Sequence, residues 1–154
     1  MQTPTINISE LFVTPVDTKM PTTFYSEISN TGQGKAEDFE VMIDFGESTV
    51  EKCEWTPSSL ATLKDMEELS IRLLQVSSLN KDTSLYVICS MNLPYFKKMS
   101  VGGGNISIQK SINYDAYKEM RSGEEVSFYT GLWRTILIGF CGLFFFKLVG
   151  ILFD

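Results

Sequence analysis

The chain has 154 residues, 44% of them hydrophobic, and a formal net charge of −6, which suits one ordinary domain. It contains no histidine, which excludes Ser–His and Cys–His nucleophilic schemes, zinc sites with His ligands and His-based pH switching. Residues 1–131 carry 11 Lys and Arg against 18 Asp and Glu, so nucleic acid is not an expected partner, because phosphate binding needs clustered cations.

Residues 1–112 consist of short apolar segments separated by turn residues, with no long helical period. The clearest segment is AEDFEVMIDF (36–45), whose period-two pattern predicts a half-buried strand with four inward residues: Phe39, Val41, Ile43 and Phe45. Similar reasoning predicts strands in six further segments: 5–13, 22–29, 48–55, 69–76, 84–91 and 102–112. This number of short strands predicts an all-β fold, an antiparallel β-sandwich.

Four details of these segments are open to test. NTGQG (30–34) predicts a turn in which Asn and Gly allow positive φ. In 69–76 the alternation predicts Leu69, Ile71 and Leu73 on one side of the strand. Residues 58–69 predict either a helical turn or a loop, and PYFKKM (94–99) predicts an edge loop. The last strand is expected to include Ile106 and Ile108.

The stretch FYSEISNTGQGKAEDFEVMID (24–44) resembles the strand–NTG–strand signature of CARDB-type and related bacterial immunoglobulin-like domains. In that signature a strand ends in an Asn-Thr-Gly turn, a small residue follows (Ala36 here), and an alternating strand leaves. The resemblance implies an immunoglobulin-like sandwich over residues 1–112. It also implies an extracytoplasmic module, whereas the first residues, MQTPTINISELFV, have neither the basic nor the long apolar region of a signal peptide.

Three cysteines occur, Cys53, Cys89 and Cys141, and none forms a CxxC pair, so a metal knuckle is not expected. Cys53 and Cys89 both fall in strand-like stretches and could face each other in a sandwich. We expect them to be reduced core cysteines, because free cysteine is among the most buried residue types and nothing directs the chain for export.

No constellation of residues predicts catalysis or a cofactor. The acidic run around the strand at 36–45 lacks the loop pattern of a calcium site, so we expect it to form a solvated face: Glu37, Asp38, Glu40 and Asp44. The glycines of VGGGN (101–105) precede a strand and not a helix, so they predict a hairpin or bulge loop in place of a phosphate site. We expect no enzyme activity, no metal and no cofactor.

The end of the chain predicts a membrane anchor. Residues 113–131 are polar and read as a linker, in which Tyr114, Tyr117 and Met120 have helical spacing. Residues 132–153 are almost wholly apolar and would span about 33 Å as a helix, enough to cross a bilayer core of about 30 Å. Three residues near its start are expected to anchor it at the water–lipid interface: Tyr129, Trp133 and Arg134.

Two features of this segment suggest more than anchoring. One helical face carries small residues that let helices approach closely: Thr135, Gly139, Gly142 and Gly150. Lys147 lies roughly 10 Å inside the span, where it either snorkels to the headgroups or meets a protein interface or wet lumen.

The favoured interpretation is a non-enzymatic, tail-anchored, single-pass membrane protein with a cytosolic immunoglobulin-like domain. That domain would bind a protein partner or a second copy of itself at the lipid surface. One alternative is a membrane-active effector whose helices oligomerise into a pore. The other is an extracytoplasmic adhesion or envelope module.

Overall fold

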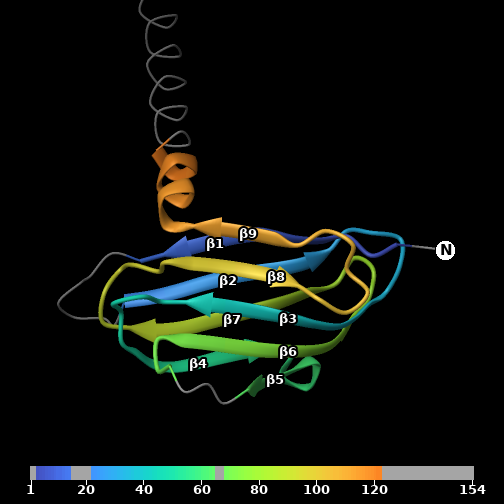
Figure 1. The fold of residues 1–154 in the computed structure, drawn as a ribbon, viewed down its shortest axis with the longest axis horizontal. Helices are drawn as coiled ribbons and strands as arrows, with labels where there is room; N and C mark the ends of the chain where they lie inside the picture. Colours follow the sequence, from blue (N-terminus) through green and yellow to red (C-terminus); the bar gives the residue numbers. More distant parts are fainter. Residues whose placement is uncertain (1–2, 15–21, 65–67, 123–154) are drawn as a thin grey trace, which may run out of the picture. The chain divides into compact units, whose positions relative to one another are not determined.

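The computed structural model describes residues 3–14, 22–64 and 68–122. Strands in this part form two antiparallel sheets packed face to face, so the predicted all-β sandwich is confirmed (Figure 1). Sheet 1 has the order β1-β2-β7-β4, and its strands are β1 (Ile6–Val13), β2 (Thr22–Asn30), β7 (Ser84–Met91) and β4 (Val50–Thr56).

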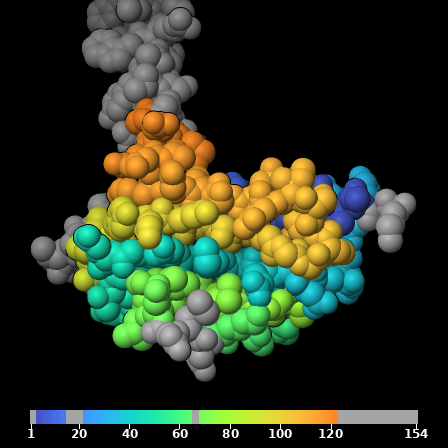
Figure 2. Space-filling view, viewed as in Figure 1, coloured from blue at the N-terminus to red at the C-terminus, as the bar shows by residue number. Residues whose placement is uncertain are grey.

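Sheet 2 has the order β5-β6-β3-β8-β9 and faces the viewer in Figure 1. Its strands are β5 (Ala61–Lys64), β6 (Ile71–Leu79), β3 (Ala36–Asp44), β8 (Lys98–Gly102) and β9 (Lys110–Asn113). A one-turn 3₁₀ helix, η1 (Ser58–Leu60), carries the chain from β4 to β5 at one side, and β1 and β9 lie beside each other at the opposite side. Figure 2 shows the same side of the molecule in space-filling form.

The chain divides into two compact units, residues 1–114 and 115–154. Residues 114–122 form a helix, which confirms the helical spacing seen in the linker. The segment expected to span a membrane, 132–153, lies outside the described residues. Among the residues that are described, no helix is long and apolar enough to cross a bilayer.

The core confirms the period-two pattern of β3. Phe39, Val41, Ile43 and Phe45 are all fully buried. Phe45 belongs to a cluster of rings between the sheets, in which Phe24 packs edge-on against both Phe45 and Phe96, with ring centroids 5.4 Å apart in each pair. Rings in this geometry add favourable quadrupole contacts to the burial of apolar area, so the cluster fixes how the two sheets pack.

The NTG turn has a different cause from the one predicted. Gly32 does not have a positive φ; a Cβ there would lie 2.2 Å from the backbone nitrogen of Thr5. The turn binds the segment before β1, because Thr31 N donates to Thr5 O (2.9 Å) and Gln33 N donates to Thr3 O (3.2 Å). Glycine is therefore required for the close approach of two backbones.

Several strand predictions need correction. In β6 the buried residues are Leu74, Val76 and Leu79. The side of the strand that carries Ile71 and Leu73 is therefore the outer one, and Leu69, before the strand, is 82% exposed. The last strand begins at Lys110, and Ile108 is 63% exposed. Residues 98–102, the first two of which belong to the predicted edge loop, form β8 and pair with β3 inside the sheet. Residues 58–64 contain both the helical turn and a short strand, β5.

The expectation of reduced cysteines is wrong. Cys53 and Cys89 are joined by a disulfide, with Cα atoms 4.1 Å apart. They are directly opposite in β4 and β7 of the same sheet, not on facing sheets. The β-bulge between Val50 and Lys52 sets this register, and it turns Cys53 toward the interior beside the fully buried Cys89.

Candidate binding surface

The outer face of sheet 1 carries a cluster of large side chains, three exposed and one (Tyr25) half-buried, which we call the aromatic patch: Phe12, Tyr25, Tyr86 and Ile88. Strand register builds it. Phe12 of β1 is opposite Tyr25 of β2, and Tyr25 is opposite Ile88 of β7. Tyr86 is diagonal to Tyr25, and their rings stack with centroids 6.3 Å apart and planes 24° apart.

The patch is exposed although its residues are large. Phe12 is 38% exposed, Tyr86 37% and Ile88 44%. These residues occupy the strand positions that alternate with the core residues, for example Leu85, Val87 and Cys89 in β7, so they must point away from the interior. Neighbouring exposed apolar residues on one sheet face are a common mark of an interaction surface.

Carboxylates border the patch. Glu10 is directly opposite Glu27 in the β1–β2 register, and Glu27 is opposite Tyr86. Glu27 Oε1 accepts a hydrogen bond of 2.5 Å from Ser84 Oγ. Within the described ranges no Lys or Arg forms an ion pair with either Glu10 or Glu27.

The carboxylates act on Tyr25 electrostatically. Burial of the phenol raises the pKa of Tyr25 above its ordinary value of 10.0, and the negative charges of Glu10 and Glu27 and the neighbouring Tyr86 raise it further. The hydroxyl of Tyr25 is therefore neutral over the physiological range of pH, and it lies within the electrostatic influence of two carboxylates.

This environment predicts an alkaline loss of stability. Because the pKa of Tyr25 is higher in the folded chain than in the unfolded chain, the folded state binds more protons above pH 10. The contribution of the protonated Tyr25 phenol to the stability of the fold is complete below pH 10, and it is lost as the pH rises through the pKa of Tyr25 in the folded chain. Glu10→Gln should lower the pKa of Tyr25 toward its ordinary value. A tyrosinate absorbance titration of both proteins, with Tyr25→Phe subtracted, measures the shift; identical titrations would contradict the assigned cause.

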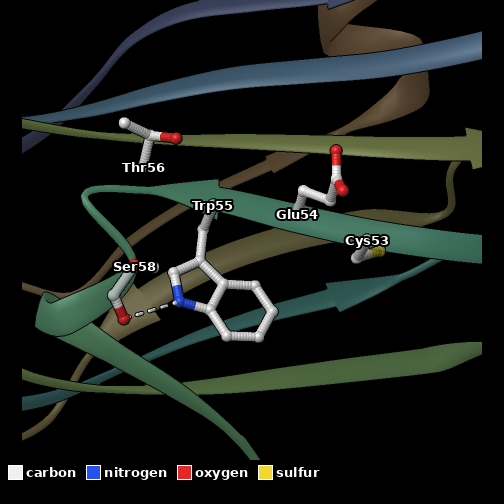
Figure 3. A pocket seen from close by; sticks show the side chains of 5 residues that line it. All are labelled: Cys53, Glu54, Trp55, Thr56 and Ser58. Atoms are coloured by element: carbon white, nitrogen blue, oxygen red, sulfur yellow. Dashed lines mark hydrogen bonds between the residues drawn. The ribbon is translucent and has the colours of Figure 1, made fainter.

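A hollow of about 450 Å³ lies beside the patch along the edge strand β4. Its lining residues are Cys53, Glu54, Trp55, Thr56 and Ser58 (Figure 3). Trp55 points to the opposite side of β4 from Glu54 and Thr56. Its indole nitrogen donates to the carbonyl oxygens of Ala61 (2.9 Å) and Ser58 (3.4 Å), so the donor is already used within the fold.

Glu54 connects the hollow to the aromatic patch. It is opposite Ile88 in the β4–β7 register and pairs with the exposed Lys52 at 2.5 Å. Exposed ion pairs contribute little, so this lysine does not neutralise the face permanently. Glu54 and Thr56 therefore line the hollow and also lie opposite two patch residues, Ile88 and Tyr86.

Sheet 2 has a different outer face. Glu40 pairs with Lys64 at 2.7 Å and Asp44 with Lys97 at 3.4 Å, so these two carboxylates of the predicted solvated run have cationic partners. In the part of the chain that the structure describes, no three His, Cys, Asp or Glu side chains are grouped to hold a metal. Gly103 and Gly104 turn the chain after β8 with φ of 89° and 56°.

The residues singled out in the sequence for membrane roles lie outside the described residues: Thr135, Gly139, Gly142, Gly150, Lys147, Tyr129, Trp133 and Arg134. Sequence reasoning alone did not identify the aromatic patch. Its signal is present in TFYSEI and LYVICS, where aromatic or aliphatic residues fill both phases of a strand. One of the two phases must then be exposed in a two-layer sandwich.

Comparisons with known proteins show no family. No protein-family model matches the chain, and no curated protein matches it in sequence. Among solved structures, a chitin-binding domain of a chitinase from Pyrococcus furiosus is similar at a TM-score of 0.43 and 9% identity, over 70% of this chain and 100% of that one. The yeast delta-COP-I mu-homology domain, solved with a Dsl1 WxWxV peptide, is similar at 0.41 and 14%, over 62% of this chain and 38% of that one. Neither similarity bears on what this chain binds.

Proposed function

We propose that this chain is a non-enzymatic protein-binding module that residues 132–153 hold at a membrane. The aromatic patch carries the binding role, because Tyr86 and Ile88 remain well exposed on β7, an inner strand of sheet 1, beside the outward-facing rings of Phe12 and Tyr25. Tyrosine is enriched among the few residues that supply most of the affinity at protein interfaces. The strand–NTG–strand geometry around Asn30 supports the finer assignment to the immunoglobulin-like, CARDB-type pattern.

The disulfide supports an extracytoplasmic position for the sandwich. Disulfides persist in oxidising compartments and are rare in the cytosol. Cys53–Cys89 therefore favours the adhesion or envelope alternative over the cytosolic placement expected from the sequence. In this proposal the apolar segment fixes the module to a membrane surface that faces an oxidising space.

Thiol counting in intact cells tests this placement. The chain has three cysteines, so denaturation in the presence of a maleimide polymer should attach one label, at Cys141, if Cys53 and Cys89 are bonded in the cell. Prior reduction should give three labels. Cys53→Ser/Cys89→Ser is the matched control and should give one label in both cases. Three labels without reduction would overturn the extracytoplasmic placement if, in addition, protease applied to the cytosolic side of the membrane digests the sandwich.

The anchor makes a separate prediction. An arginine at the centre of a spanning helix opposes insertion by about 2.5–3.5 kcal/mol. Leu143→Arg/Phe144→Arg should therefore release the protein from membranes washed with alkaline carbonate. Phe153→Arg adds charge at the end of the segment and should leave the protein in the membrane fraction. Equal retention of both variants would show that residues 132–153 do not form the anchor.

A further inference from the structure

The cross-strand pair Glu10–Glu27 is an unfavourable feature within sheet 1. Like charges directly opposite each other in an antiparallel pair destabilise the sheet. In sheet 2, by contrast, Glu40 and Asp44 each have a lysine partner. Among the described residues Glu10 and Glu27 have none, and their negative charges act on the phenol of Tyr25. The face is thus arranged so that a positive charge supplied from outside would stabilise it.

The aromatic patch provides the second half of such a site. Tyr25 and Tyr86 stack beside the carboxylate pair and expose ring surface next to it. Aromatic rings attract cations within about 6 Å of the ring centroid. A guanidinium group both stacks on a ring and binds carboxylates through several N–H donors, whereas an ammonium group is a compact, strongly hydrated charge. Rings next to carboxylates that have no cationic partner in the described part of the chain therefore suit arginine better than lysine.

The negative charge of this surface also disfavours other binding partners. Two copies joined face to face would bring Glu10, Glu27 and Glu54 of one copy toward the same residues of the other, with Lys52 as the sole cation among these residues. Such a like-charge contact costs affinity. Anionic lipid and nucleic acid are disfavoured for the same reason.

We infer that the aromatic patch, together with Glu10 and Glu27, docks an arginine-bearing segment of a partner protein. This inference rests on the proposed protein-binding function and adds the chemistry of the partner. The partner's guanidinium groups contact the two carboxylates and the rings of Tyr25 and Tyr86, and its apolar side chains cover Phe12 and Ile88. The neighbouring edge strand β4 limits the docked segment on one side.

The test uses the full chain in nanodiscs of neutral lipid and a fluorescent twelve-residue peptide that alternates arginine with glycine. We expect saturable binding by fluorescence anisotropy, weaker binding of the lysine version and none of the glutamate version. Glu10→Gln/Glu27→Gln should weaken binding about tenfold or more, because charge-assisted contacts are lost. The matched control Glu40→Gln/Asp44→Asn removes the same charge from sheet 2 and should leave binding unchanged.

A second measurement separates binding from folding. Because Glu10→Gln/Glu27→Gln relieves a like-charge contact, its melting temperature should equal or exceed that of the natural chain while its affinity falls. Tyr86→Ser should also weaken peptide binding. Equal loss of affinity in the sheet 2 control, or no effect of the Glu10 and Glu27 changes, would overturn the inference.

Photo-cross-linking distinguishes failure of the inference from failure of the proposed function. A photoreactive phenylalanine analogue replaces Tyr86 in cells, with Met42 on the outer side of sheet 2 as the control position. A protein adduct at position 86 that disappears with Glu10→Gln/Glu27→Gln supports the inference. An adduct that survives those changes would refute the arginine-bearing partner but leave protein binding standing. Absence of any adduct at position 86 would refute the proposed function itself.

Discussion

Asn30→Ala should destabilise the sandwich by roughly 3–5 kcal/mol, because it removes four hydrogen bonds from a fully buried site. The side-chain oxygen of Asn30 accepts from the backbone nitrogens of Thr5 (3.2 Å) and Gly32 (3.1 Å). Its side-chain nitrogen donates to the carbonyl oxygens of Gly34 (2.8 Å) and Leu79 (2.9 Å). Alanine would leave these backbone groups without a partner, and each such buried group costs about 1–3 kcal/mol.

The position of Asn30 explains why the loss is large. The residue ends β2, and through its side chain it holds the segment before β1, its own turn and the end of β6 in the other sheet. Asn30→Asp keeps the accepting oxygen but places a carboxylate against two carbonyl oxygens, so it should also destabilise strongly. Both variants act on the connection between the sheets.

Denaturant unfolding of the full chain in detergent, followed by near-ultraviolet circular dichroism, measures this effect. The matched control is Asn7→Ala, which removes one hydrogen bond, of 2.8 Å to Thr31 Oγ1, at an exposed site. Its expected cost is below about 1 kcal/mol. If the two alanine variants unfolded at similar denaturant concentrations, the four-bond account of Asn30 would be wrong.

The parts of the fold that sequence alone predicted are those with strong local patterns. In β3 the phase of the buried residues follows directly from Phe39, Val41 and Ile43, and no other strand is needed to interpret it. In β8 the alternation covers only two inward residues, Met99 and Val101, before glycines follow, so the segment is too short to be predicted as a strand by itself. It becomes a strand because β3 and β9 supply hydrogen-bonding partners on both sides, which is tertiary information.

The candidate surface depends even more on long-range pairing. Glu10 and Glu27 are opposite each other because of the β1–β2 register, which includes a bulge after Ile8. Tyr25 meets Tyr86 because β2 and β7 are neighbours, although 61 positions of numbering separate the two residues. Alternation in the sequence predicts which residues point outward, but not which outward residues become neighbours.

The disulfide illustrates the same limit. Cys53 and Cys89 were placed correctly on strands, yet facing sheets and a single sheet were equally compatible with the sequence. The chain leaves sheet 1 after β2, returns as β4 and returns again as β7, and this order brings the two cysteines side by side. The bulge in β4 then sets the register in which the two cysteines are directly opposite each other.

Removing this disulfide is the second change expected to have a large effect. A cross-link between residues 36 positions apart lowers the conformational entropy of the unfolded chain. In this account its loss should lower the free energy of unfolding by about 3–4 kcal/mol. Cys53→Ala/Cys89→Ala should therefore unfold at lower denaturant concentration than the oxidised chain. The reduced natural chain should resemble the double variant, because both lose the constraint and keep the surrounding packing.

Comparison of four samples decides between constraint and packing: the natural chain and the double variant, each with and without reductant, in the full chain with detergent. Reductant should lower the stability of the natural chain alone. Cys141→Ala, which leaves the disulfide intact, should behave as the natural chain does in both conditions. If reductant left the natural chain unchanged while the double variant was unstable, side-chain packing of Cys89 would be the cause. A module that keeps its stability when reduced would also be compatible with the cytosol, so this measurement bears directly on the side of the membrane at which the aromatic patch can act.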